Sequence, residues 1–156
     1  MNKGIATDTE ASIESELLKH GCYASNTIGT SMRPLFAHHR DMVVLVPLTA
    51  PLKKRDIILY PDGRGNYILH RIIGIREDVY VVRGDNTYAK EYVPKSAVVA
   101  VLSEYNRKGK HHRVSDFSHR LYSFVWCAIY PVRHLWRSSL NFARRVYRKI
   151  FPKKSK

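Results

Sequence analysis

The chain has 156 residues, 44% of them hydrophobic, which is enough for one compact domain with an appendage but too little for two full domains, and which excludes wholesale disorder. The net charge of +14 is uneven: residues 107–156 hold 14 Lys and Arg against one acid, whereas residues 1–106 hold 13 against 12. Two distant cysteines exclude a disulfide framework and a cysteine metal site, so we expect two reduced, partly buried thiols.

The first element expected is a short helix over residues 9–20. Thr9 can cap this helix and Gly21 can end it. Its apolar stripe consists of Ile13, Leu17 and Leu18. Residues 1–20 contain several acids and no apolar run, so they do not resemble a secretory signal.

From Tyr23 to about Leu102 the pattern changes to short β-forming runs between Pro, Gly and polar breakers. The runs are 42–46, 57–60, 67–75, 79–82 and 98–102. Several short strands at this spacing predict a compact, mainly β domain that is partly barrel-like.

A basic segment at 107–113 is expected to be a linker. Beyond it, apolar residues recur at spacings of three and four with Arg and Lys between them, and Pro131 interrupts the pattern. This predicts one or two basic amphipathic helices over 117–151. The longest stretch without charged residues or His runs from Leu121 to Val132, too short for a bilayer core, which needs about 20 residues.

The segment Gly29-Thr30-Ser31-Met32-Arg33-Pro34 can present a serine on a loop. Its glycine permits a turn, its proline stiffens the exit, and backbone donors near Ser31 can receive an oxyanion. Taken alone, such a loop is usually only a turn, because a serine hydroxyl becomes nucleophilic when a base lies within hydrogen-bond reach.

His70 is the candidate base. It lies in the β-forming run 67–75, and strand alternation places it on one face with Ile68 and Ile72. An imidazole can act as a base near neutral pH without a large pKa shift. The alternative is a core histidine bonded to a backbone carbonyl, and a lone histidine would favour that alternative.

A third motif, Arg83-Gly84-Asp85-Asn86, is common in turns. Functionally, Asp85 could orient the His70 imidazole and hold its tautomer, as the acid of a Ser-His-Asp arrangement does. Arg71, next to His70 on the predicted strand, is expected to point away from it and to be solvated.

In this order the three motifs resemble the signal peptidase I family and the related self-cleaving repressor peptidases. Those families share Gly-x-Ser-Met-x-Pro, matched by residues 29–34. They also share a strand with the base before Arg-Val-Ile-Gly or similar, matched by 70–74, and Gly-Asp-Asn, matched by 84–86. Residues 54–60 are similar to a family strand that begins Gly-Asp-Ile-Val, and the resemblance covers roughly residues 22–104.

The resemblance implies a serine endopeptidase that cleaves leader or signal-like peptides through an acyl-enzyme, and this reaction implies no metal or organic cofactor. Ser31 is then the nucleophile, His70 the general base and Asp85 the orienting acid. Most bacterial members use Lys as the base, so His70 resembles the endoplasmic-reticulum and sporulation branch. That branch has a further acid downstream, and Glu91 is the acid nearby in this sequence.

The expected organisation is an N-terminal helix in residues 1–21, a peptidase domain in 22–106 and a basic amphipathic helical tail in 107–156. Family signal peptidases carry an amino-terminal membrane anchor, which this sequence lacks. We therefore expect a cytoplasmic protein, peripheral at the inner face of the membrane, whose residues 117–151 bind an anionic membrane surface. A nucleic acid is the less favoured partner of the tail.

Two other functions stay open. One is a regulatory relative of the self-cleaving repressors, although no helix-turn-helix fits in the 20 residues before the β domain and those relatives pair Ser with Lys. The other is a catalytically inactive relative that binds peptides without cutting them.

Overall fold

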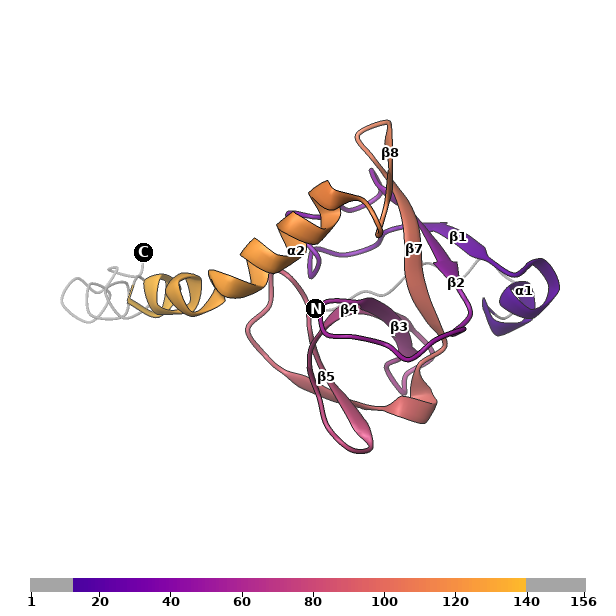
Figure 1. Cartoon of the computed structure of the whole chain (residues 1–156), viewed down its shortest axis with the longest axis horizontal. Coiled ribbons are helices and arrows are strands. Elements are labelled where there is room, and N and C mark those ends of the chain that lie inside the picture. Colours follow the sequence, from indigo (N-terminus) through magenta and orange to yellow (C-terminus); the bar gives the residue numbers. More distant parts are fainter. Residues whose placement is uncertain (1–12, 140–156) are drawn as a thin grey trace, which may run out of the picture.

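The computed structural model describes residues 13–139, and their strands form one curled antiparallel sheet (Figure 1). Its strands are β1 (Tyr23–Asn26), β2 (Met42–Val46), β3 (Ile57–Pro61), β4 (Tyr67–Ile75), β5 (Val79–Arg83), β6 (Glu91–Pro94), β7 (Ala100–Arg107) and β8 (Lys110–Arg113). The helices are α1 (Ile13–His20), the short 3₁₀ helix η1 (Lys95–Ala97) and α2 (Phe117–Ala128), and residues 130–139 are also helical. The predicted mainly β fold with flanking helices is confirmed.

The strand order is β1-β2-β7-β3-β4-β5-β6, and β8 pairs with β7. β7 and β8 form a hairpin through Lys108 and Gly109, whose φ angles are 52° and 76°. Two successive residues with positive φ match the twist of a tight hairpin. The prediction of a linker over 107–113 is therefore wrong, because these residues extend the sheet.

Side chains alternate between the two faces of the sheet and contribute to two hydrophobic clusters. The first joins strand residues to α1 and to the loop after β1; its members include Ile13, Leu17, Met32, Leu35, Phe36, Ile57, Leu59 and Leu69. The second contains Leu52, Ile58, Tyr60, Ile68, Ile72, Tyr80, Val82 and Val93. Ile68 and Ile72 thus lie together, as strand alternation predicts, and His70 lies between them on β4.

The N-terminal helix is described from Ile13, so its predicted cap Thr9 lies outside the described residues. Gly21, with φ of 70°, ends the helix and donates its N–H to the Leu17 carbonyl, as predicted. Leu18 does not share the apolar stripe, since 89% of it is exposed. Ile13 and Leu17 are four residues apart and point inward together, whereas the next position turns away.

Helix α2 packs against the sheet, and helical residues 130–139 run outward from it (Figure 1). The described part of the predicted helical tail is helical over 117–128 and 130–139, with a turn at Ile129 between them, and residues 140–151 lie outside the described part. Among residues 13–139, no helix combines the length and the apolar character that crossing a membrane requires.

Candidate functional site

The loop between β1 and β2 carries Ser31, and its conformation is held from both sides. Thr27 closes the base of the loop, because its hydroxyl contacts the carbonyls of Ala37 and Asp41 at 3.0 and 3.1 Å. Gly29 has a φ of 95°, which favours glycine at this turn. Three buried apolar side chains anchor the residues after the serine: Met32, Leu35 and Phe36.

The Gly-Asp-Asn turn after β5 lies directly against this loop. The Asn86 N–H donates to the Ser31 carbonyl at 2.7 Å, and the Asn86 side-chain amide donates to the Thr30 carbonyl at 3.2 Å. Two segments more than 50 residues apart in the sequence are thus joined by hydrogen bonds. The turn positions the backbone of Ser31.

Gly84 shows how closely Ser31 and His70 approach each other. A Cβ built on Gly84 would lie 2.7 Å from the Ser31 carbonyl oxygen, 3.1 Å from Ser31 Cβ and 2.9 Å from His70 Nε2. All three distances are measured from the same Cβ position. Ser31 Cβ and His70 Nε2 therefore lie close to each other, on either side of the space that a side chain would fill. A side chain at position 84 would occupy the space between them.

The other ring nitrogen of His70 has two partners. His70 Nδ1 lies 3.1 Å from the Tyr60 hydroxyl and 3.3 Å from Glu91 Oε1. The Tyr60 hydroxyl donates its single proton to Glu91 Oε2 at 2.7 Å. Its oxygen is therefore the acceptor toward His70, and this arrangement favours the tautomer with the proton on Nδ1 and a lone pair on Nε2.

The charge states of these partners support the same arrangement. The hydrogen bond from His70, opposed by burial and aided by Tyr60, lowers the pKa of Glu91 below its ordinary value. Burial, together with Glu91, raises the pKa of the Tyr60 hydroxyl. Glu91 is thus held as a carboxylate and Tyr60 as a neutral phenol, so the proton on Nδ1 has a permanent acceptor.

His70 Nε2 is buried and has no hydrogen-bond partner in residues 13–139. No hydrogen bond therefore joins it to Ser31 in this structure, which differs from the expectation for a nucleophile and its base. Buried polar atoms are normally satisfied, so an orphaned one calls for an explanation. Its position beside the Ser31 side chain means that a change in the serine rotamer or an incoming ligand can supply the missing partner.

Asp85 does not face His70, so the predicted role of orienting acid is wrong for this residue. Its carboxylate forms a two-pronged ion pair with Arg71, Nε to Oδ1 and Nη2 to Oδ2, both at 2.8 Å. Alternation along β4 sends Arg71 and His70 to opposite faces, and Arg71 pairs in register with Arg83, two residues before Asp85. The acid that contacts His70 is Glu91.

Arg71 is 1% exposed, so the expectation of a solvated side chain is also wrong. Its Nη1 donates to Ser123 in α2 at 2.7 Å and to the Arg55 carbonyl at 3.0 Å. Burial lowers the pKa of Arg71, but Asp85 outweighs this effect and raises it overall. The buried ion pair joins the Gly-Asp-Asn turn to α2.

Another serine–histidine pair lies in α2, where Ser123 Oγ is 3.2 Å from His119 Nε2. Both side chains are buried, at 2% and 4% exposure, and Arg71 already donates to the serine hydroxyl. Burial lowers the pKa of His119 to about 4, with the positive charge of Arg71 adding to the effect. The Ser123 hydroxyl is buried and accepts a hydrogen bond from the Arg71 guanidinium, so its role is structural. Ser123 and His119 are therefore not the candidate site.

Sequence reasoning grouped Ser31 and His70 with Asp85, did not choose Glu91 and missed Tyr60. The usable signal for Tyr60 is alternation within the run 57–60, which puts every second residue on one face. The register between β3 and β4, with Ile58 opposite His70, brings Tyr60 diagonally to the imidazole. That register comes from the sheet and is not visible in the sequence.

Comparisons with known proteins assign the chain to no family: no protein-family model matches it, and no curated protein matches its sequence. Within residues 13–139, no group of three His, Cys, Asp or Glu is arranged to hold a metal ion. Cys22 is exposed and Cys127 half-buried, and both are free thiols. The candidate site therefore consists of Ser31, His70, Glu91 and Tyr60.

Proposed function

We propose that this protein is a serine endopeptidase of the signal-peptidase type, with Ser31 as nucleophile and His70 as general base. The observation that carries the proposal is the buried, unpartnered Nε2 of His70 beside the Ser31 side chain. Support also comes from Glu91 and Tyr60, which hold the opposite nitrogen in the tautomer that a base requires. Asp85 positions the turn behind Ser31 through Arg71 and is not a catalytic residue.

In the proposed reaction, Ser31 Oγ attacks the peptide carbonyl carbon while its proton passes to His70 Nε2. The imidazolium that forms is stabilised by Glu91 through Nδ1–H. Nε2–H then protonates the leaving amine, and the C–N bond breaks to leave an ester on Ser31. A water molecule attacks the carbonyl carbon of this acyl-enzyme and gives its proton to Nε2. The ester C–O bond then breaks, Nε2–H returns the proton to Ser31 Oγ, and the carboxylic acid product leaves.

The negative oxygen of the tetrahedral intermediate needs hydrogen-bond donors. Among the hydrogen bonds of residues 13–139, none uses the Ser31 N–H as donor. The loop is held instead through the Ser31 carbonyl, which Asn86 engages. The free N–H at the nucleophile is the donor we assign to the oxyanion.

The proposed substrate is a leader or signal-like segment of a peptide or protein. This class follows from the resemblance of the motifs at 29–34, 70–74 and 84–86 to the signal-peptidase and repressor-peptidase families. The proposed location is the cytoplasm, at the inner face of the membrane.

The test is cleavage of a complex peptide mixture, read by mass spectrometry. The full chain is incubated with peptides of defined length, and new termini are compared with those from Ser31→Ala and His70→Ala. Ser25→Ala is the matched control, because this half-buried serine on β1 lies outside the candidate site. New termini in the wild type and Ser25→Ala, absent from the other two, support the proposal. Equal cleavage by Ser31→Ala overturns it.

A second candidate function, peptide binding without cleavage, is favoured by the absence of a Ser31–His70 hydrogen bond. Such a catalytically inactive or regulatory relative of the repressor peptidases would bind the same peptides in the wild type and in Ser31→Ala. Binding by both proteins, with no new termini from either, would select this function.

A further inference from the structure

Helix α2 is amphipathic, but its polar face packs on the domain and its apolar face is exposed, which is the opposite of an ordinary surface helix. The side packed on the sheet is polar: His119 and Ser123 are buried there. Trp126 and Arg133 both donate to the Asp85 carbonyl at 3.0 Å. Hydrogen bonds and the packing of Tyr122 against the first hydrophobic cluster, rather than a continuous apolar stripe, hold this helical segment to the domain.

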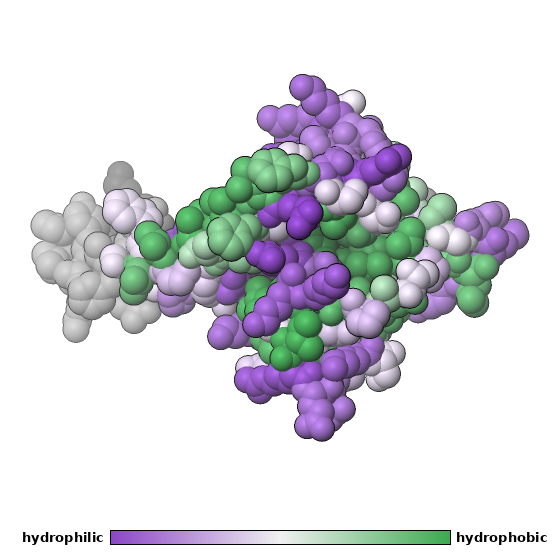
Figure 2. Space-filling model, in the orientation of Figure 1, coloured by the Kyte–Doolittle hydropathy of each residue, from purple (hydrophilic) through white to green (hydrophobic). Residues whose placement is uncertain are grey.

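The apolar side chains of the same segment point to solvent. Phe117 is 79% exposed and Trp136 is 70% exposed. The exposed apolar set, which we call the apolar face, is Phe117, Leu121, Phe124, Val125, Ile129, Val132, Leu135 and Trp136. Figure 2 shows the band of hydrophobic residues along α2, with hydrophilic residues beside it. A contiguous exposed apolar band of this kind marks an interaction surface.

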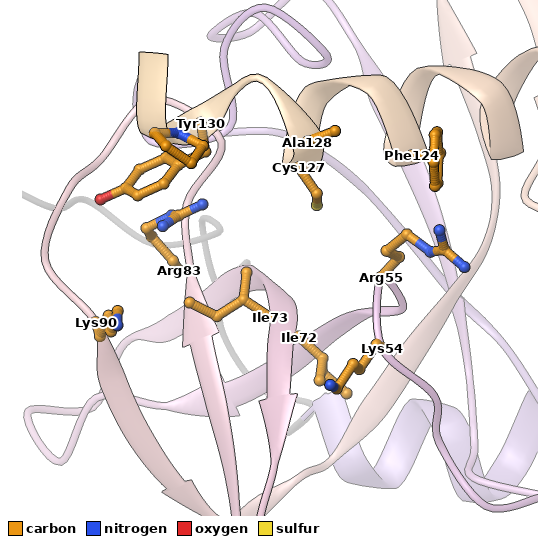
Figure 3. A pocket seen from close by; sticks show the side chains of 11 residues that line it. Lys54, Arg55, Ile72, Ile73, Arg83, Lys90, Phe124, Cys127, Ala128 and Tyr130 are labelled. Atoms are coloured by element: carbon orange, nitrogen blue, oxygen red, sulfur yellow. The ribbon is translucent and has the colours of Figure 1, made fainter. Parts of the chain in front are cut away.

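A cationic pocket opens beside this face, between α2 and strands β4 and β5 (Figure 3). Its volume is about 540 Å³. Phe124 and Ile73 contribute apolar wall. Its cations are Lys54, Arg55, Arg83 and Lys90, and no acid lines it. The pocket thus combines positive charge with an apolar wall.

The four pocket cations make no salt bridge with any residue of the described part of the chain. Two of them lie over aromatic rings instead: Arg83 is 3.2 Å from the ring centre of Tyr130, and Arg55 is 5.5 Å from that of Phe124. No carboxylate of residues 13–139 forms an ion pair with these cations, so the pocket is suited to an anionic group.

We propose that the apolar face and the cationic pocket together dock on an anionic lipid bilayer. The apolar side chains enter the boundary between headgroups and acyl chains, and the pocket receives a headgroup phosphate. The inference concerns a surface away from Ser31 and does not depend on the proposed peptidase activity.

The charge of the pocket and the side-chain types of the apolar face favour a bilayer over other occupants. A second copy of the chain would bring the same uncompensated cations against these. A nucleic acid would satisfy the cations and stack on aromatic rings, but Leu121, Val132 and Leu135 have no π face for a base. An anionic bilayer presents negative charge and an apolar interior within a few ångströms of each other, and so matches both features.

The chain contains two tryptophans, Trp126 and Trp136, and both lie in this segment. The variant Trp126→Phe leaves Trp136 as a single reporter on the apolar face. We expect its emission to shift to the blue with vesicles of phosphatidylcholine and phosphatidylglycerol, and to be quenched by brominated acyl chains. Vesicles of phosphatidylcholine alone should produce neither change.

Matched variants of the full chain separate the two features. Leu121→Gln with Val132→Gln should weaken vesicle binding at least tenfold, whereas Leu18→Gln, which is even more exposed but lies on α1, should not. Lys54→Gln with Lys90→Gln should weaken binding several-fold. Lys19→Gln with Lys110→Gln removes the same charge from α1 and β8 and should have a smaller effect. Circular dichroism checks that each variant is folded.

The proposal is overturned if the protein co-sediments with anionic vesicles while Trp136 is not quenched, because the tail charge alone then holds it. It is also overturned if the Leu121 and Val132 variant binds as well as wild type. Binding of inorganic phosphate or an oligonucleotide, with a steep salt dependence and no response to vesicles, would assign the pocket to a soluble anion or nucleic acid instead.

Discussion

His70 and Glu91 are joined by a 3.3 Å contact between Nδ1 and Oε1, although they lie on β4 and β6 with β5 between them. Tyr60 bridges the same two side chains from β3. The imidazole is therefore fixed by side chains from two other strands, and its free nitrogen is directed at the loop that carries Ser31.

We predict that Glu91→Gln lowers kcat by about 10²-fold or more, because the amide removes the negative charge that holds Nδ1–H and stabilises the imidazolium. Steady-state kinetics on a cleaved peptide measures the effect. Glu104→Gln is the control, since its carboxylate pairs with His111 and Arg113 away from the site. Unchanged kcat in Glu91→Gln would show that this carboxylate does not act on His70.

Asp85→Asn should act mainly on stability. It leaves the buried Arg71 guanidinium without its carboxylate, which costs about 3–5 kcal/mol for a buried pair broken on one side. Urea denaturation of the variant and wild type measures the difference in unfolding free energy. If stability is unchanged and only turnover falls, the carboxylate takes part in the chemistry and the assignment made here is wrong.

Gly84→Ala should abolish cleavage and destabilise the fold by about 1–3 kcal/mol, as expected for an overpacked site. The added methyl would lie 2.7 Å from the Ser31 carbonyl, which the loop backbone cannot yield without moving the nucleophile. Gly74→Ala is the matched control, because its methyl would meet the Val81 side chain at an ordinary 3.4 Å. Wild-type kcat in Gly84→Ala would contradict the close approach of Ser31 and His70.

Folding stability should fall as the pH drops from about 6.5 to about 4. The buried His119 has a folded pKa near 4 against an ordinary 6.5, so over this range the unfolded chain binds a proton that the folded chain does not. His119 accounts for a loss of about 3 kcal/mol in the free energy of unfolding. This loss does not occur above pH 6.5, where the imidazole is neutral in both the folded and the unfolded chain. His119→Gln should remove this part of the decline, as measured by urea denaturation at several pH values. If the free energy of unfolding falls with pH by the same amount in the wild type and in His119→Gln, the role of His119 is contradicted.

Local sequence patterns were reliable where one segment determines the outcome. The β-forming runs at 42–46 and 67–75 coincide with β2 and β4, and the end of α1 at Gly21 follows from glycine's tolerance of positive φ. The turn at 107–113 shows the limit, since its Lys and His content indicated a linker although Lys108 and Gly109 close a hairpin. Composition was misleading there because a short edge strand needs few apolar residues.

The sequence alone determined the elements of this site and their order: a serine loop, a histidine on a buried strand and a Gly-Asp-Asn turn. Only the tertiary structure decided which acid serves the histidine, because neighbours on one strand point to opposite faces and cross-strand register selects the partners. Asp85 consequently meets Arg71, and Glu91 meets His70. The tertiary structure also decided the orientation of α2. Helical spacing in the sequence predicts an apolar face and a polar face. Because the buried Arg71 binds Ser123 on the polar face, the apolar face is directed to solvent.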